Sequence, residues 1–113
     1  MATKTTAAPE SGAANQDQLA PLFNVVLLDD DEHTYDYVIE MLQKLFLHSS
    51  SDAFRHAVEV DTTGRTVVIT CGLLEAEFGR DQIQAYGPDW RMPKSKGSMR
   101  AVIEPTSGHP EVS

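Results

Sequence analysis

The chain has 113 residues and a formal net charge of −8, from 17 acidic and 9 basic side chains. That length suits one domain, and the negative charge argues against nucleic-acid binding because it offers phosphates no attractive field. No apolar run approaches the ~20 residues that cross a membrane, and the single cysteine, Cys71, cannot form an internal disulfide, so we expect a cytoplasmic monomer.

The two ends of the chain differ in composition from its middle. Residues 1–20 are mostly Ala, Thr, Ser, Gln, Gly and Pro, and so little apolar surface cannot offset the entropy lost on ordering. We therefore predict a disordered N-terminal arm over residues 1–20, which is either inert or reaches a partner. The folded domain is predicted over residues 21–105, and residues 106–113 form a polar C-terminal tail.

The stretch FNVVLLDDDEHTYDYVIEMLQKLF, residues 23–46, organises the rest of the chain. Its apolar start, residues 23–28, is short and rich in β-branched residues, which predicts a buried strand. Apolar side chains then recur at three- and four-residue spacing over residues 35–46, which predicts an amphipathic helix. Four consecutive acids, residues 29–32, are crowded between the two, so their mutual repulsion favours a cationic partner.

Three interpretations of the acidic run are open. A metal site is disfavoured, because consecutive residues cannot all point at one ion and the spacing of a calcium-binding loop is absent; we predict no metal. Helix capping by Asp31, His33 or Thr34 would account for one or two polar residues. A cation-binding rim explains more of the acids, since carboxylates accept strong, charge-assisted hydrogen bonds from an ammonium group.

The next segment predicts a short helix over residues 52–60, capped by the preceding serines and followed by a turn. Asp61 either begins that turn or meets a cation, because the helix dipole disfavours an acid at this end. His56 is interpreted as a surface or capping residue. A strand over residues 66–71 follows, in which Cys71 is a small core residue. The side chains expected to be buried on the helix are Ala53, Phe54, Ala57 and Val58.

The last third of the chain predicts a helix over residues 73–86, a loop over residues 89–98 and a strand over residues 99–104. The resulting order, β-α-α-β-α-β, is a small α/β sandwich of the α+β type, in which helices pack on a three-stranded sheet. No catalytic or nucleotide-binding motif is present. We therefore expect neither an enzyme nor a cofactor.

The pattern resembles the ClpS adaptors of the Clp proteases, over residues 21–105. The resemblance lies in LFNVVLLDDDEHTYDYVIEMLQKLF, in Val60-Asp61 with the following Thr-Thr-Gly, and in the strands at 66–71 and 99–104. It implies a non-catalytic adaptor that binds the free, bulky N-terminal residue of a protein substrate, an N-degron. Such an adaptor delivers the substrate to a ClpA- or ClpC-like AAA+ unfoldase, which docks on another face.

The resemblance also implies a binding site, residue by residue. Asp29, Asp30 and Asp61 fall on positions that bind the substrate's α-ammonium group, where the family has Asn in place of Asp29 and His in place of Asp61. An Asp is an anionic acceptor, so we expect a strongly negative empty pocket and at least one raised carboxylate pKa. The pocket-lining positions fall on Thr34, Tyr35, Val38, Met41, Ala57 and Val60.

A second hypothesis keeps the fold and changes the function. In it the chain is a protein-interaction module whose partner carries no N-degron. The two hypotheses differ in one measurable respect, because only the adaptor requires a free α-amino group on its ligand.

Overall fold

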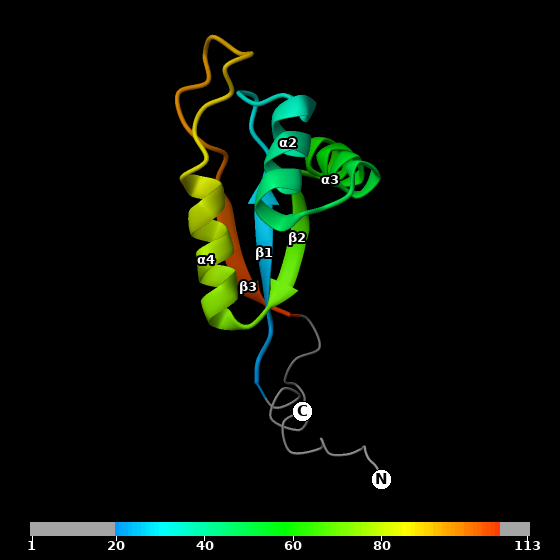
Figure 1. The fold of residues 1–113 in the computed structure, drawn as a ribbon, viewed down its shortest axis with the longest axis vertical. Coiled ribbons are helices and arrows are strands. Elements are labelled where there is room, and N and C mark those ends of the chain that lie inside the picture. The colour runs from blue at the N-terminus through cyan, green and yellow to red at the C-terminus, as the bar shows by residue number, and fades with distance from the viewer. Residues whose placement is uncertain (1–19, 107–113) are drawn as a thin grey trace.

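The computed structural model describes residues 20–106 and shows three helices with a three-stranded antiparallel sheet (Figure 1). The order along the chain is β-α-α-β-α-β, which confirms the predicted α+β fold. The predicted arm and tail, apart from Ala20 and Thr106, lie outside the described residues. The elements are β1 (Phe23–Leu28), α2 (Tyr35–Phe46), α3 (Ser50–Thr63), β2 (Arg65–Cys71), α4 (Leu73–Gln84) and β3 (Ala101–Pro105).

Strand β1 lies in the centre of the sheet, whose order is β2-β1-β3. Its alternation places Val25 and Leu27 in the core under the helices. The register between β1 and β2 shifts between Val25 and Val26, where Val25 pairs with Ile69 and Val26 with Val67. The residue skipped by this bulge, Val68, joins the core. Both edge strands run antiparallel to β1 and begin beside its last residues, so the acidic run starts where the sheet stops.

Two capping side chains begin the first two helices. Thr34 has extended backbone and its hydroxyl accepts the Tyr37 N–H, which begins α2 as the sequence suggested. Ser49 does the same for α3 through the Asp52 N–H. Helix α3 is longer than the predicted 52–60, because the Thr62 and Thr63 hydroxyls bond back to helix carbonyls and Gly64, with φ of 92°, ends it. Asp61 therefore lies inside the last turn of α3.

Two other boundaries also move. Helix α4 ends at Gln84, two residues before the predicted end, and β3 begins at Ala101, two residues after the predicted start. The connection between them, residues 85–100, extends past the end of the sheet and lies near the turn that follows β1 (Figure 1). Within residues 20–106, no helix has the length and apolar character that a membrane crossing requires.

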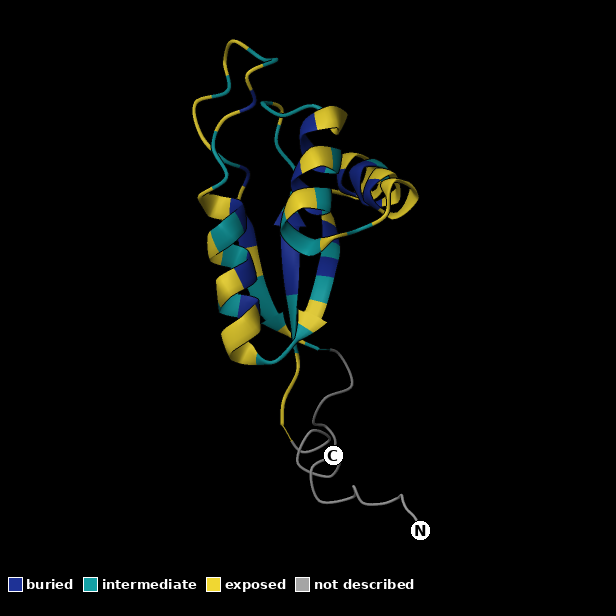
Figure 2. Ribbon diagram, in the orientation of Figure 1, coloured by how far each residue is buried: buried dark blue, intermediate teal, exposed yellow. Residues whose placement is uncertain are grey.

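The core fills the space between the sheet and the inner sides of the helices, as the buried band in Figure 2 shows. Two predictions about α3 are wrong. Phe54 is 51% exposed, because it lies on the outer side of the helix. His56 is buried, and its Nδ1 lies 2.7 Å from the Thr66 hydroxyl on β2. The fully buried side chains include Val25, Leu27, Met41, Leu42, Ala53, Ala57, Ala76 and Ile83.

Candidate functional site

The acidic turn is held against the ends of the neighbouring strands by its backbone. The Leu28 N–H donates to the Arg100 carbonyl and the Asp29 N–H donates to the Gly64 carbonyl, each at 3.0 Å. The Asp30 carboxylate then turns back and accepts the Glu32 N–H at 2.9 Å. These bonds fix the start of the chain that follows β1.

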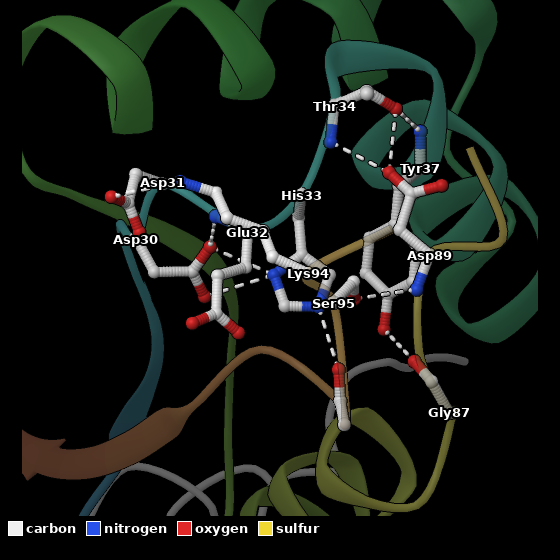
Figure 3. Close-up of polar contacts among 11 residues, drawn as sticks. Asp30, Asp31, Glu32, His33, Thr34, Tyr37, Gly87, Asp89, Lys94 and Ser95 are labelled. Carbon is white, nitrogen blue, oxygen red and sulfur yellow. Dashed lines mark hydrogen bonds and ion pairs between the residues drawn. The ribbon is translucent and has the colours of Figure 1, made fainter. Parts of the chain in front are cut away.

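The His33 ring lies between the acidic turn and the loop over residues 85–100. Its Nδ1 lies 2.8 and 3.0 Å from the two Asp30 carboxylate oxygens, and its Nε2 lies 2.7 Å from the Gly97 carbonyl (Figure 3). Both partners are pure acceptors, so both contacts are hydrogen bonds only when each ring nitrogen carries a hydrogen. The side chain is only 2% exposed. His33 thus joins the acidic turn to residues 85–100.

A second contact joins the same two segments. The buried Asp89 carboxylate accepts the Thr34 N–H at 2.7 Å and the Thr34 hydroxyl at 2.8 Å (Figure 3). It also accepts a hydrogen bond from Arg91. Burial by itself raises the pKa of Asp89, but the hydrogen bonds from Thr34 and Arg91 outweigh it and leave that pKa lowered. Asp89 therefore holds the capping residue that begins α2.

A small cavity of about 30 Å³ lies between the acidic turn, the start of α2 and the end of α3. Its apolar wall is made by Val38, Ala57, Val60 and Met99, and polar groups surround its mouth. The full lining is Asp29, Asp30, His33, Thr34, Tyr35, Val38, Ala57, Val60, Asp61 and Met99. A cavity of this size holds about one water molecule.

Most residues that the sequence singled out meet at this cavity. Met41 does not line it, because it faces the core and is fully buried. His33 and Met99 line it without having been predicted. His33 follows the acids directly and could have been included on that ground. Met99 has no such local signal, because only the fold brings the segment before β3 to this place.

The cavity mouth carries uncompensated negative charge. Burial raises the pKa of Asp29, and repulsion from Asp61, Asp30 and Asp31 raises it further against the opposing backbone hydrogen bond from Asp30. Asp29 is therefore a carboxylate with the raised pKa that we expected from the sequence. Among residues 20–106, no Lys, Arg or His forms a salt bridge with Asp29 or Asp61, whereas Asp30 meets His33 and Asp31 meets Lys94.

Asp61 has a neutral partner across the mouth. The Tyr35 hydroxyl, on α2, donates to Asp61 Oδ2, on α3, at 2.7 Å. This bond raises the pKa of Tyr35 above its ordinary value, because a neighbouring carboxylate disfavours a phenolate. The Tyr35 ring also meets the exposed Phe54 ring edge-on, with centroids 6.1 Å apart.

Two other features of the described residues are weaker candidates. A hollow of about 520 Å³ is lined by Phe54, Arg55, Val58, Glu59 and Thr62. These residues come from one face of α3, so the hollow is open surface. Over residues 20–106 no three His, Cys, Asp or Glu side chains are placed to hold a metal ion.

Comparison with known proteins places the chain beside one family. Residues 18–93 match the family described as ATP-dependent Clp protease adaptor protein ClpS. The adapter protein ClpS of Synechococcus elongatus is 32% identical over 88 residues, which are 77% of this chain and 90% of that protein. The ClpS of Gloeobacter violaceus is 36% identical over 67 residues, which are 58% of this chain and 72% of that protein.

A solved structure has the same fold. Agrobacterium tumefaciens ClpS2 bound to L-phenylalaninamide superposes with a TM-score of 0.66 and 23% sequence identity, and the match covers 76% of this chain and 98% of that one. At this identity the likeness concerns the fold of the two chains.

Proposed function

This chain belongs to the ClpS family of non-catalytic Clp protease adaptors and is an N-degron adaptor, and we propose that the cavity between α2 and α3 is its N-degron site. In this proposal the apolar wall takes the side chain of the substrate's first residue. The carboxylates at the mouth take its α-ammonium group.

The observation that carries the proposal is that an apolar wall lies beside carboxylates that have no salt-bridge partner among the described residues. Asp29 and Asp61 both line the mouth and lack a cationic partner among the described residues. An ammonium group supplies that charge and donates hydrogen bonds to it. Asp30 contributes indirectly as well, because it holds His33, which bonds the loop that carries Met99 of the apolar wall.

The bound amide in the Agrobacterium ClpS2 structure fits this chemistry. L-phenylalaninamide carries a free amino group and a bulky apolar side chain on one small molecule. We propose that this chain takes ligands of the same class: peptides with a free amino group on Leu, Phe, Tyr or Trp.

The finer features of the adaptor role are also proposals. The chain acts as a monomer and has no catalytic activity of its own. It passes its substrate to a ClpA- or ClpC-like AAA+ unfoldase. The cytoplasm is the expected compartment, because the single cysteine fits a reducing environment.

The test is fluorescence anisotropy with peptides that differ only at the first residue, namely Leu, Phe, Tyr, Trp, Met and N-acetyl-Phe. We expect saturable binding of the free bulky residues and loss of binding on acetylation. Equal binding of acetylated and free peptides would contradict the proposed site and favour a protein-interaction module with another partner.

Asp61→Asn tests the carboxylate itself. It keeps the side-chain size and removes the charge, so we expect binding to the Phe peptide to weaken by about 1.5–3 kcal/mol, the range for a hydrogen bond to a charged group. Asp81→Asn is the matched control, because Asp81 is exposed on α4 and pairs with Arg80 away from the cavity. A similar loss in both variants would show that only net charge matters.

A further inference from the structure

The cavity described above is too small for the ligand class assigned to it. About 30 Å³ holds roughly one water molecule, whereas pockets that enclose ligands are roughly ten times larger or more. A Leu or Phe side chain therefore enters only if part of the lining moves. The apolar wall is held by buried residues such as Val38 and Val60, which are 3% exposed. The moving part must come from the exposed lining.

Tyr35 is the exposed aromatic residue of that lining. It is 38% exposed and lies at the first position of α2, so its side chain moves without disturbing the core. Its hydroxyl reaches across to Asp61 in the last turn of α3. This bond joins the two helices whose residues form facing walls of the cavity.

We propose that the Tyr35–Asp61 hydrogen bond is a latch that closes the empty cavity, and that the ligand's ammonium group opens it by replacing the Tyr35 hydroxyl at Asp61. The inference rests on the proposed function, because it concerns the same site.

The latch links admission of the side chain to the presence of a free amine. Asp61 is exposed, so water can replace the Tyr35 hydroxyl, but a charged donor forms a stronger hydrogen bond with the carboxylate and favours the open state. An ammonium group supplies a charged donor and an acetylated amine does not. The raised pKa of Tyr35 agrees with a hydroxyl that is held by the carboxylate.

Tyr35→Phe tests the latch, because it removes the hydroxyl and keeps the ring that packs against Phe54. If the hydrogen bond holds most molecules closed, its loss raises the fraction of open molecules. Apparent affinity rises in proportion to that fraction. We expect the Phe peptide to bind about fivefold more tightly, as a net hydrogen bond of ordinary strength implies.

The rate constants separate a latch from a change in wall shape. A larger open fraction accelerates association by the same factor and leaves dissociation unchanged. Stopped-flow anisotropy measures both. Tyr86→Phe is the matched control, because it removes a tyrosine hydroxyl outside the cavity and should leave both rates unchanged.

The outcomes distinguish this inference from the proposed function. Suppose that the wild-type protein binds the Phe peptide. If Tyr35→Phe then binds with equal or weaker affinity, or binds more tightly only because dissociation is slower, the latch is overturned and the N-degron site stands. If neither protein binds any free-amine peptide, the proposed function fails and the latch fails with it. If only Tyr35→Phe binds, the latch is the dominant barrier and both statements hold.

Discussion

At the residue scale, His33 connects two segments that are distant in the sequence. It is a buried imidazole between a carboxylate and a carbonyl, and it connects the turn after β1 to residues 85–100. His33→Ala removes both bonds and leaves the Asp30 carboxylate, with a side chain 26% exposed, facing an empty space. We expect the free energy of unfolding to fall by about 2 kcal/mol, measured by urea denaturation.

The neighbouring ion pair supplies the control. Lys94 and Asp31 lie 3.2 Å apart, but their side chains are 56% and 86% exposed. Exposed pairs contribute little, so Asp31→Asn should change the free energy of unfolding by less than about 0.5 kcal/mol. If the two variants lost equal stability, burial would not be the reason for the effect at His33.

At the element scale, the end of α2 is suboptimal. Leu47 has a left-handed backbone with φ of 58°, a region that costs a β-carbon-bearing residue about 1–2 kcal/mol. Its side chain is 86% exposed, so burial of the side chain does not offset this cost. Leu47→Gly should therefore raise the free energy of unfolding by about 1 kcal/mol. The measurement is the shift of the urea midpoint, with the m-value unchanged.

The same substitution inside a helix should have the opposite sign. Leu74 is 79% exposed on α4, so its replacement also removes little burial. Leu74 lies in the first turn of α4, where the backbone is helical, and Leu74→Gly should lower the free energy of unfolding by up to about 1 kcal/mol, the value for a helix interior. Two variants that shifted stability in the same direction would show that backbone conformation does not explain the gain at Leu47.

Sequence reasoning succeeded for elements whose signal is local. The strand at β1 and the order of elements follow from neighbouring residues alone, and the caps Thr34 and Ser49 are among the candidates that those residues offered. The extension of α3 to Thr63 was missed because threonine and aspartate are weak helix formers. There the threonine hydroxyls bond back to the helix itself.

Features that depend on distant contacts were not accessible in this way. Gly79 lies where a β-carbon would come within 3.2 Å of both Ile69 and Phe46, so the helix can pack closely there, and no neighbouring residue signals this contact. Asp89 holds the start of α2 from 55 residues away. Of the candidate site, the acids and the residues facing them were recognisable from the family pattern, whereas Met99 was placed by the fold alone.

At the scale of the whole molecule, a buried histidine links stability to pH. His56 Nδ1 bonds Thr66, whose own hydroxyl hydrogen goes to Glu59, so Nδ1 must be the donor. The other side of the ring faces His48, with centroids 5.0 Å apart. Burial lowers the pKa of His56, and the charges of His48 and Arg55 lower it further against the opposing effect of Glu59 and Asp52.

The sign of the pH dependence follows from that direction. Because the folded pKa is below the unfolded value of about 6.5, the unfolded chain binds more protons as the solution is acidified. The stability is complete above the unfolded pKa and is lost as pH falls through the folded pKa. A single group changes the free energy of unfolding by at most about 1.4 kcal/mol per pH unit. We expect His56→Gln to lack this part of the decline between pH 7 and pH 5.

The difference between the two proteins isolates His56 from the other titrating groups. Urea denaturation at pH 8, 7, 6 and 5 gives one stability curve for each protein, and groups common to both cancel in the difference. The curves should converge as the pH falls, because the wild-type protein alone loses the preference for a neutral His56. Parallel curves would mean that the ring becomes protonated as easily in the fold as in water, and that α3 tolerates a charge against β2.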